Sequence, residues 1–396
     1  MKKKLIILFS IVSMLILLIN PCVADDENEG IFEAASLKTG PASPGLPSVS
    51  AGAAILMDMN SGRVMYDKNA RSRRPMASTT KIMTAILAIE KGNLNDVVTV
   101  SRRAASVGGS TIDLKAGQKI SLRELLYGLM LNSGNDAAIA IAEHIGGSVD
   151  GFSQMMNQKA SEIGAYDSNF KSPHGLDVEG HYSTAYDLAL MARYALNNPV
   201  FSKIVSTKVT SISTRGLANT NEMLSIYPGA DGVKTGYTGQ AGRCLVTSVT
   251  RNNWKLISVV LNCASREARA GSSKAILDYG YNNFKPVTLL KEGEYIKDIP
   301  VLRGKPGNVC LYAEEGISMP LREDEMSALK KIYDIPENVN APVGGGMVIG
   351  TVRFVVGGKE IASSGVKTAC AVKRKDVWDY LLEMIRSFHS VMKDGF

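Results

Sequence analysis

Histidine, cysteine and aromatic residues are scarce in this chain of 396 residues, which has four histidines, five cysteines and an aromatic content of 6%. His174, Asp177 and His181 lie close together, but their spacing matches no familiar set of metal ligands, so we interpret them as hydrogen-bonding loop residues. No serine stands in a Gly-x-Ser-x-Gly motif, which excludes the nucleophile elbow of α/β-hydrolases. We expect no metal and no cofactor.

The cysteines are also too widely spaced for a disulfide framework. One of them, Cys22, lies in an N-terminal apolar segment, and the other four are Cys244, Cys263, Cys310 and Cys370. We expect these four to be small buried hydrophobic residues. A single disulfide bond among them is an open alternative.

A strong charge of one sign is missing as well. The formal net charge of +7 falls to +4 without the N-terminal Lys2, Lys3 and Lys4. That mild excess is compatible with an anionic membrane or wall and gives no reason to expect nucleic-acid binding. The hydrophobic content of 45% and the charged content of 21% are those of an ordinary globular protein.

Residues 1–24 resemble a signal peptide. They combine a basic start, an uncharged apolar run over residues 5–19 and the small residues Cys22 and Ala24 before Asp25. We predict export, with cleavage after Ala24. A retained anchor is disfavoured because the run is short for a membrane span. Lipidation of Cys22 is a further alternative, although Asn20-Pro21 makes a poor lipobox.

The composition and residue pattern divide the rest of the chain into several regions. Residues 25–50 are acidic, then rich in Pro, Gly and Ser, and predict a flexible lead-in. Residues 51–284 predict an α+β domain with helices against one sheet. Its expected elements are a hairpin over 53–58 and 63–66, helices over 122–131, 136–145, 151–163 and 184–197, strands over 244–250 and 256–263, and a helix over 269–279. Ser121 and Glu124 form a capping box that predicts the start of the first of these helices.

After residue 284 the pattern changes. Short apolar stretches punctuated by Gly and Pro predict a small all-β domain over 285–375, without catalytic residues. Residues 376–396 predict an amphipathic helix that lies in a membrane interface, being too short and too charged to span it. Packing of this helix on the β domain is the alternative.

One stretch carries the chemistry. Residues 82–89 are apolar or small except for Thr84, which predicts a helix buried on all sides. Lys81 stands at its start, three positions after Ser78, and such residues are neighbours on a helix. Burial favours a neutral amine. That amine could accept the proton of Ser78 and make the serine a nucleophile.

Ser-x-x-Lys occurs five times in the chain, so this motif alone is weak evidence for a nucleophile. Two further motifs support the assignment of Ser78 and Lys81. They are Ser133-Gly134-Asn135, which interrupts a helical region, and Lys234-Thr235-Gly236, which leads into a strand region. A second Lys-Thr-Gly, at Lys38, precedes the serine and has no strand after it. Read alone, the second motif predicts an ordinary turn and the third a hairpin edge.

In this order the three motifs resemble those of the penicillin-binding proteins and serine β-lactamases. Within that family the chain looks most like the low-molecular-mass D-alanyl-D-alanine carboxypeptidases. The resemblance extends to Pro173-His174-Gly175-Leu176-Asp177 and to the segment 181–188. It implies a β-lactamase/transpeptidase-like catalytic domain, an antiparallel sheet with a helical subdomain, followed by the small β domain and the C-terminal helix.

The resemblance also implies the roles of residues. Ser78 attacks the carbonyl between two terminal D-alanines of a peptidoglycan stem pentapeptide, and Lys81 is the base. Ser133 relays a proton to the leaving amine, and Asn135 binds the substrate amide and Lys81.

On the opposite wall, Lys234 adds positive charge and lowers the pKa of Lys81. Thr235, with Arg269 as a helper, holds the terminal carboxylate, and Gly236 permits close approach. The backbone N–H groups of Ser78 and Tyr237 form the oxyanion hole.

The expected partners are therefore peptidoglycan peptides, β-lactam antibiotics and a membrane surface, on the extracytoplasmic face of a bacterial membrane. A β-lactamase is one alternative, but Ser133-Gly134-Asn135 replaces the Ser-Asp-Asn of class A enzymes and no glutamate-bearing loop is evident. A non-catalytic penicillin-sensing or wall-binding protein is another. Two residues depart from the subfamily pattern: Ser172, where Asn is usual, and Arg243, where an aromatic residue is common.

Overall fold

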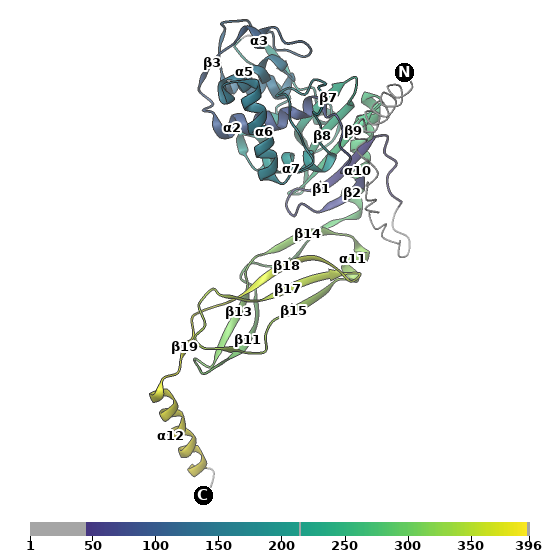
Figure 1. Cartoon of the computed structure of the whole chain (residues 1–396). Coiled ribbons are helices and arrows are strands. Elements are labelled where there is room, and N and C mark those ends of the chain that lie inside the picture. Colours follow the sequence, from purple (N-terminus) through teal and green to yellow (C-terminus); the bar gives the residue numbers. More distant parts are fainter. Residues whose placement is uncertain (1–44, 214, 394–396) are drawn as a thin grey trace, which may run out of the picture. The chain divides into compact units, whose positions relative to one another are not determined.

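A computed structural model describes residues 45–213 and 215–393 (Figure 1). The predicted signal peptide, most of the predicted lead-in and the Lys-Thr-Gly at Lys38 lie outside these residues.

Five antiparallel strands form the central sheet, in the order β2-β1-β9-β8-β7. They are β1 (Ala53–Asp58), β2 (Val64–Lys68), β7 (Ala230–Thr238), β8 (Gly242–Arg251) and β9 (Trp254–Cys263). The strands β1 and β2 thus join the three strands that follow the helical block, as the α+β prediction requires. This order makes β7, which carries Lys234-Thr235-Gly236, an edge strand.

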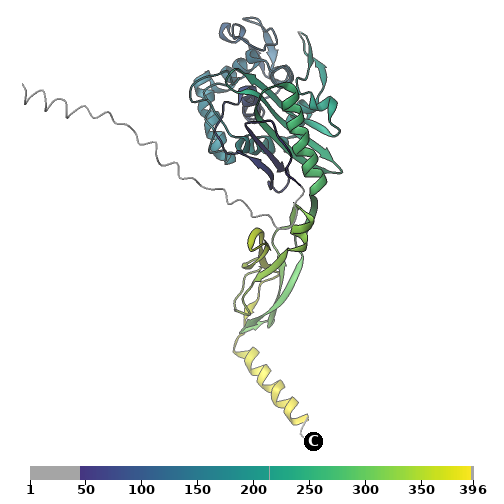
Figure 2. The same cartoon turned by 90° about the vertical axis from the view of Figure 1, so that its right-hand side faces the viewer.

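Both faces of the sheet are buried. Ala53, Ile55 and Met57 of β1 pack with the helical block, whereas Ala54 and Leu56 pack with α10 (Arg266–Asn283). Successive strand residues point to opposite faces, so a strand covered on both sides is apolar throughout. Figure 2 shows α10 as the long green helix along the sheet.

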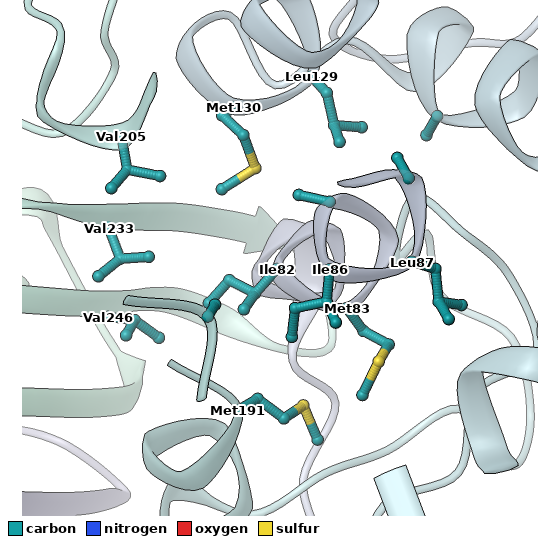
Figure 3. Close-up of a cluster of buried hydrophobic side chains, with 14 of the residues drawn as sticks. Ile82, Met83, Ile86, Leu87, Leu129, Met130, Met191, Val205, Val233 and Val246 are labelled. Carbon is teal, nitrogen blue, oxygen red and sulfur yellow. The ribbon is translucent and has the colours of Figure 1, made fainter. Parts of the chain in front are cut away.

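The predicted buried helix is α2 (Lys81–Lys91), and its residues from Lys81 to Ala88 are all buried. Around it the block holds α4 (Leu122–Leu131), α5 (Asn135–Gly146), α6 (Val149–Ile163), α7 (Ala185–Leu196) and α8 (Pro199–Ser206). In Figure 3, side chains of α2 meet others from these helices and from the sheet; the labelled ones are Ile82, Met83, Ile86, Leu87, Leu129, Met130, Met191, Val205, Val233 and Val246.

The predicted helices and strands of this region are present, with ends that differ by a few residues. The capping box of Ser121 and Glu124 opens α4 as expected. The sequence did not reveal α8 or several shorter elements, since most are too brief for a periodic pattern. The shorter ones are β3 (Val97–Thr99), α3 (Arg102–Ala105), β4 (Lys119–Ser121), β5 (Val209–Ser211), β6 (Gly216–Ala218) and α9 (Met223–Ile226).

The region that follows is built almost wholly of strands, as predicted, with one short helix, α11 (Glu323–Ser327). Six strands form one sheet in the order β15-β17-β18-β13-β11-β16. Two further pairs, β10 with β14 and β12 with β19, form small sheets of their own. The ten strands of this region are β10 (Lys285–Leu290), β11 (Tyr295–Leu302), β12 (Gly304–Lys305), β13 (Asn308–Ala313), β14 (Ile317–Leu321), β15 (Lys330–Asp334), β16 (Val339–Asn340), β17 (Val348–Val356), β18 (Lys359–Thr368) and β19 (Lys373–Arg374).

The cysteines only partly follow the prediction of burial. Cys244 and Cys263 are buried, on opposite faces of the central sheet, which keeps their thiols apart. Cys310 is half-buried and Cys370 is exposed, so the prediction is wrong for Cys370. All four are free thiols.

The C-terminal helix is α12 (Val377–Lys393). Its apolar side chains are largely exposed, among them Trp378, Ile385 and Phe388. None of the helices within the described ranges combines the length and the apolar character needed to cross a membrane.

Truncation of a side chain on α2 tests the central position of this helix. We expect Leu87→Ala to lower the free energy of unfolding by about 2–5 kcal/mol, because Leu87 is only 1% exposed and a cavity would remain. Urea denaturation followed by circular dichroism measures the change. The matched control is Leu46→Ala, at a residue that is 72% exposed and should change stability little. Equal effects of the two substitutions would contradict the packing described.

Candidate active site

Ser78 and Lys81 meet at the start of α2. Ser78 lies in a short 3-10 helix, η1 (Ala77–Thr80), rather than in the predicted first α-helical turn, and Lys81 is the first residue of α2. Side chains at i and i+3 eclipse one another in a 3-10 turn. The Nζ atom of Lys81 accordingly lies 2.8 Å from the Oγ atom of Ser78.

The Lys81 amine is fully buried and has two further partners. Nζ donates to Oδ1 of Asn135 at 2.7 Å and to the carbonyl oxygen of His174 at 2.9 Å. A neutral amine has two N–H donors and one lone pair. With both donors engaged in these two bonds, the lone pair faces Ser78 and can accept its hydroxyl proton.

Electrostatics favour that neutral form. Burial holds the pKa of Lys81 well below its ordinary value, and the like charge of Lys234 lowers this pKa further, as predicted. Asp136 acts in the opposite direction. Lys234 is itself buried, and burial together with the charge of Arg269 lowers its pKa to about 7.

The Ser133-Gly134-Asn135 turn is more firmly held than an ordinary turn between helices. Ser133 has a φ of +61°, which is uncommon for a residue with a side chain. The backbone N–H of Asn135 donates to the carbonyl of Ser110 at 2.7 Å, and its side-chain Nδ2 donates to the carbonyl of Gly108 at 2.7 Å. These bonds direct Oδ1 of Asn135 toward Lys81.

The edge strand β7 closes the other side of the site. A Cβ atom on Gly236 would lie 3.0 Å from the backbone nitrogen of Ser78, so only glycine fits there without a shift. Ser78 thus lies against the strand that carries Lys234 and Tyr237. Alternate N–H groups of an edge strand are unpaired on its outer side. The N–H groups of Ser78 and Tyr237, which we predict to be the donors of an oxyanion hole, belong to these two adjoining segments.

These elements enclose a cleft of about 630 Å³. Among its lining residues are Ser78, Ser133, Thr235, Gly236, Tyr237 and Arg269, all of which were predicted site residues. Lys81, Asn135 and Lys234 are buried behind this lining. Arg243 also lines the cleft, and its guanidinium stacks 4.3 Å from the centre of the Tyr237 ring.

Two predicted carboxylate-binding groups have other partners in the structure. The hydroxyl of Thr235 lies 2.7 Å from the hydroxyl of Thr220. Arg269 is buried and forms a salt bridge with Glu222, a residue that the sequence did not single out. Glu222 and Arg269 are far apart in the chain, and no periodic pattern relates them.

The two histidines near the site form hydrogen bonds with neighbouring groups, as predicted. Burial lowers the pKa of His181 to about 4 and that of His174 to about 3, so both rings are neutral. Nδ1 of His181 accepts from the backbone N–H of Lys171, which leaves the proton on Nε2, 2.9 Å from the hydroxyl of Thr80. Across residues 45–213 and 215–393, no three His, Cys, Asp or Glu side chains are grouped to hold a metal ion.

Position 175, in the same loop as His174, can hold only glycine, because of its backbone conformation and its close contacts. Its φ is +87°, and a Cβ atom there would lie 2.0 Å from the carbonyl oxygen of Ala77. The loop therefore packs directly on the turn that presents Ser78, and its His174 carbonyl holds the Lys81 amine. The resemblance to the carboxypeptidases draws attention to this loop. The contact of its backbone carbonyl with Lys81 was not predicted, because every residue has a carbonyl and sequence alone does not distinguish one from another.

Comparison with known proteins agrees with this geometry. A family model described as D-alanyl-D-alanine carboxypeptidase matches residues 39–265. The chain belongs to the D-alanyl-D-alanine carboxypeptidase family. A second model, described as the C-terminal domain of penicillin-binding protein 5, matches residues 284–374. The predicted enzyme class, a serine-type carboxypeptidase, is thus confirmed for this family member.

Individual relatives cover most of the carboxypeptidase chain. D-alanyl-D-alanine carboxypeptidase DacF of Bacillus subtilis is 37% identical over 79% of this chain and 83% of its own length. Penicillin-binding protein 5 of Haemophilus influenzae has a similar structure, with a TM-score of 0.77, 33% identity and coverage of 84% of this chain and 100% of that one. A mutant of the Streptomyces K15 DD-transpeptidase gives a TM-score of 0.58 at 36% identity, over 60% of this chain and 99% of that one.

The lowered pKa values predict a bell-shaped pH dependence of acylation by penicillin. The second-order rate constant should rise with pH as Lys81 loses its proton and becomes a base. It should fall above a pH of about 7, where Lys234 loses the charge that attracts an anionic ligand. Stopped-flow or quenched labelling of Ser78 over a pH series measures this profile.

An arginine substitution provides the control for the falling limb. The charge of Arg269 lowers the pKa of Lys234, so Arg269→Gln should move the falling limb to higher pH. A rate that keeps rising well above neutral pH in the unmodified protein would contradict the assignment of that limb to Lys234.

Proposed function

We propose that Ser78 forms an acyl-enzyme with the penultimate D-alanine of peptidoglycan stem pentapeptides and releases the terminal D-alanine. The observation that carries this proposal is the 2.8 Å contact between Ser78 Oγ and a buried Lys81 amine whose donors are already engaged. Burial lowers the pKa of such a base, which favours its neutral form, and the amine faces the nucleophile.

Acylation then proceeds by one proton transfer and one attack. Lys81 Nζ takes the Ser78 proton as Oγ bonds to the carbonyl carbon of the penultimate D-alanine. The N–H groups of Ser78 and Tyr237 stabilise the resulting oxyanion. The C–N bond breaks when the nitrogen of the terminal D-alanine receives the proton from Lys81, relayed through Ser133.

Binding residues orient the peptide during this step. Asn135 forms a hydrogen bond with the substrate amide while keeping its bond to Lys81. Lys234 and Thr235 attract the terminal carboxylate, with Arg269 behind them. Water next attacks the ester carbonyl, Lys81 accepts its proton, and Ser78 is regenerated as the tetrapeptide leaves.

A β-lactam enters the same cleft and acylates Ser78, but its leaving nitrogen stays tethered to the acyl group. Slow hydrolysis of that ester distinguishes this enzyme from a β-lactamase, which would turn over nitrocefin rapidly. Transfer to an amine acceptor is a second candidate activity, favoured by the similarity to a protein named DD-transpeptidase. A purely penicillin-sensing role leaves the base and the carboxylate-binding groups unexplained.

Substitution of the nucleophile tests the acyl-enzyme. Ser78→Ala should reduce release of D-alanine from a pentapeptide by at least about a thousandfold and abolish the mass increase produced by penicillin. Chromatography of the released amino acid and intact-protein mass spectrometry provide the two readouts. Ser327→Ala is the matched control, because Ser327 also precedes a lysine by three positions but is exposed. Penicillin labelling of a residue other than Ser78 would contradict the proposal.

We also propose that the chain is exported by residues 1–24 and acts on the outer side of the cytoplasmic membrane, with a catalytic domain over 51–284 and a β domain over 285–375. The exposed apolar side chains of α12 support attachment of residues 376–396 to the membrane surface. An amphipathic helix of this length gains free energy by placing such side chains among the lipid headgroups.

Charged substitutions on α12 test this attachment. Ile385→Asp combined with Phe388→Asp should abolish co-flotation of the protein with phosphatidylglycerol vesicles, because a carboxylate cannot enter the apolar part of the interface. Leu302→Asp, at an exposed residue of the β region, is the control and should leave flotation unchanged. Unaltered flotation of the doubly substituted protein would show that α12 is not the attachment site.

A further inference from the structure

The salt bridge between Glu222 and Arg269 lies within the active-site cleft, since both residues line it together with Ser78. The Arg269 side chain is 6% exposed and that of Glu222 is 28% exposed. This is therefore a partly shielded pair at the place where the proposed mechanism uses the Arg269 guanidinium to bind a carboxylate.

The pairing uses the guanidinium edge that suits a carboxylate. Nη2 of Arg269 donates to both oxygens of Glu222, at 2.6 and 2.7 Å, and Nε donates to Oε1 at 3.1 Å. Parallel donors on one guanidinium edge form the preferred two-point contact with a carboxylate. Glu222 thus occupies a position in which a substrate carboxylate would make the same bonds.

The backbone around Glu222 is anchored to the strand that binds substrate. Asn221 is buried, and its Nδ2 donates to the carbonyl of Gly232 in β7 at 2.8 Å. Its Oδ1 accepts from the backbone N–H of Met223, the first residue of α9. Thr220 contacts the hydroxyl of Thr235. The Glu222 carboxylate is therefore held beside Arg269 by the same segment that adjoins the Lys234-Thr235-Gly236 motif.

We propose that Glu222 is a specificity-determining residue, an internal carboxylate that occupies Arg269 and must be displaced by the terminal carboxylate of the substrate. The inference rests on the proposed binding of that carboxylate beside Thr235 and Arg269. Glu222 lowers the affinity for every carboxylate-terminated ligand, and it thereby reduces the advantage of such ligands over uncharged ones.

Acylation by benzylpenicillin and by its uncharged methyl ester tests this directly. In Glu222→Gln the neutral amide keeps the size of the side chain but no longer competes as an anion. The rate constant for the acid should rise roughly three- to tenfold, as expected for the loss of one competing charge in a partly shielded site. The rate constant for the ester should stay within about twofold, so the ratio of acid to ester increases.

A matched substitution separates competition from general electrostatics. Glu267 lines the same cleft and is exposed, so Glu267→Gln removes the same charge without freeing Arg269. It should leave the ratio of acid to ester unchanged. Arg269→Gln should lower the ratio, whether Glu222 is present or not.

Three results would overturn the proposal: an unchanged ratio in Glu222→Gln, a fall in the rate for the acid alone, or an equal rise in Glu267→Gln. The second of these would show that Glu222 only positions Arg269. Reactivity of the ester reports whether each variant is folded and has a working Ser78. Because this readout needs no peptide hydrolysis, it is independent of the carboxypeptidase assay, and failure of that assay alone would leave the Glu222 result interpretable.

Discussion

The interaction on which the structure of the site depends is the burial of the Lys81 amine. An ammonium group taken out of water loses a large hydration free energy, and it regains this only from well-placed partners. Here Asn135, the His174 carbonyl and Ser78 surround the nitrogen, and each comes from a different part of the catalytic region. The amine can also lower its free energy by releasing its proton. The neutral amine that results is the form that acts as the base in catalysis.

Several unusual backbone conformations around the site follow from the same requirement. Ala77 and Ser133 both have positive φ values, at the two turns that present hydroxyl groups to the cleft. Gly175 and Gly236 lie so close to the backbone of Ala77 and Ser78 that a Cβ atom at either glycine would crowd it. A positive φ costs about 1–3 kcal/mol at a residue with a side chain, such as Ala77 or Ser133, and surrounding packing must maintain it. The fully buried helix α2 and the sheet behind it supply that packing.

The sequence predicted those features that depend on local pattern. The all-apolar stretch after Lys81 identified the buried helix, the capping box identified the start of α4, and the order of three short motifs identified the family. It could not predict that Ser78 lies in a 3-10 turn, since the i and i+3 spacing suits both helix types. Nor could it predict the Glu222–Arg269 pair or the His174 carbonyl, because these contacts arise from the folding together of distant segments.

The sheet order has a consequence for how the folded state can be recognised. Ser78 and Asn135 belong to the helical block, whereas Lys234 and Tyr237 belong to a strand at the sheet edge, and β1 and β2 complete that sheet from the beginning of the domain. A contiguous fragment that contains every reacting group must run at least from Ser78 to Tyr237, and it would still lack β1 and β2 of the sheet. Covalent labelling by a β-lactam therefore reports the docking of helices on strands, and a fluorescent penicillin would count correctly assembled molecules in a mixture with misfolded ones.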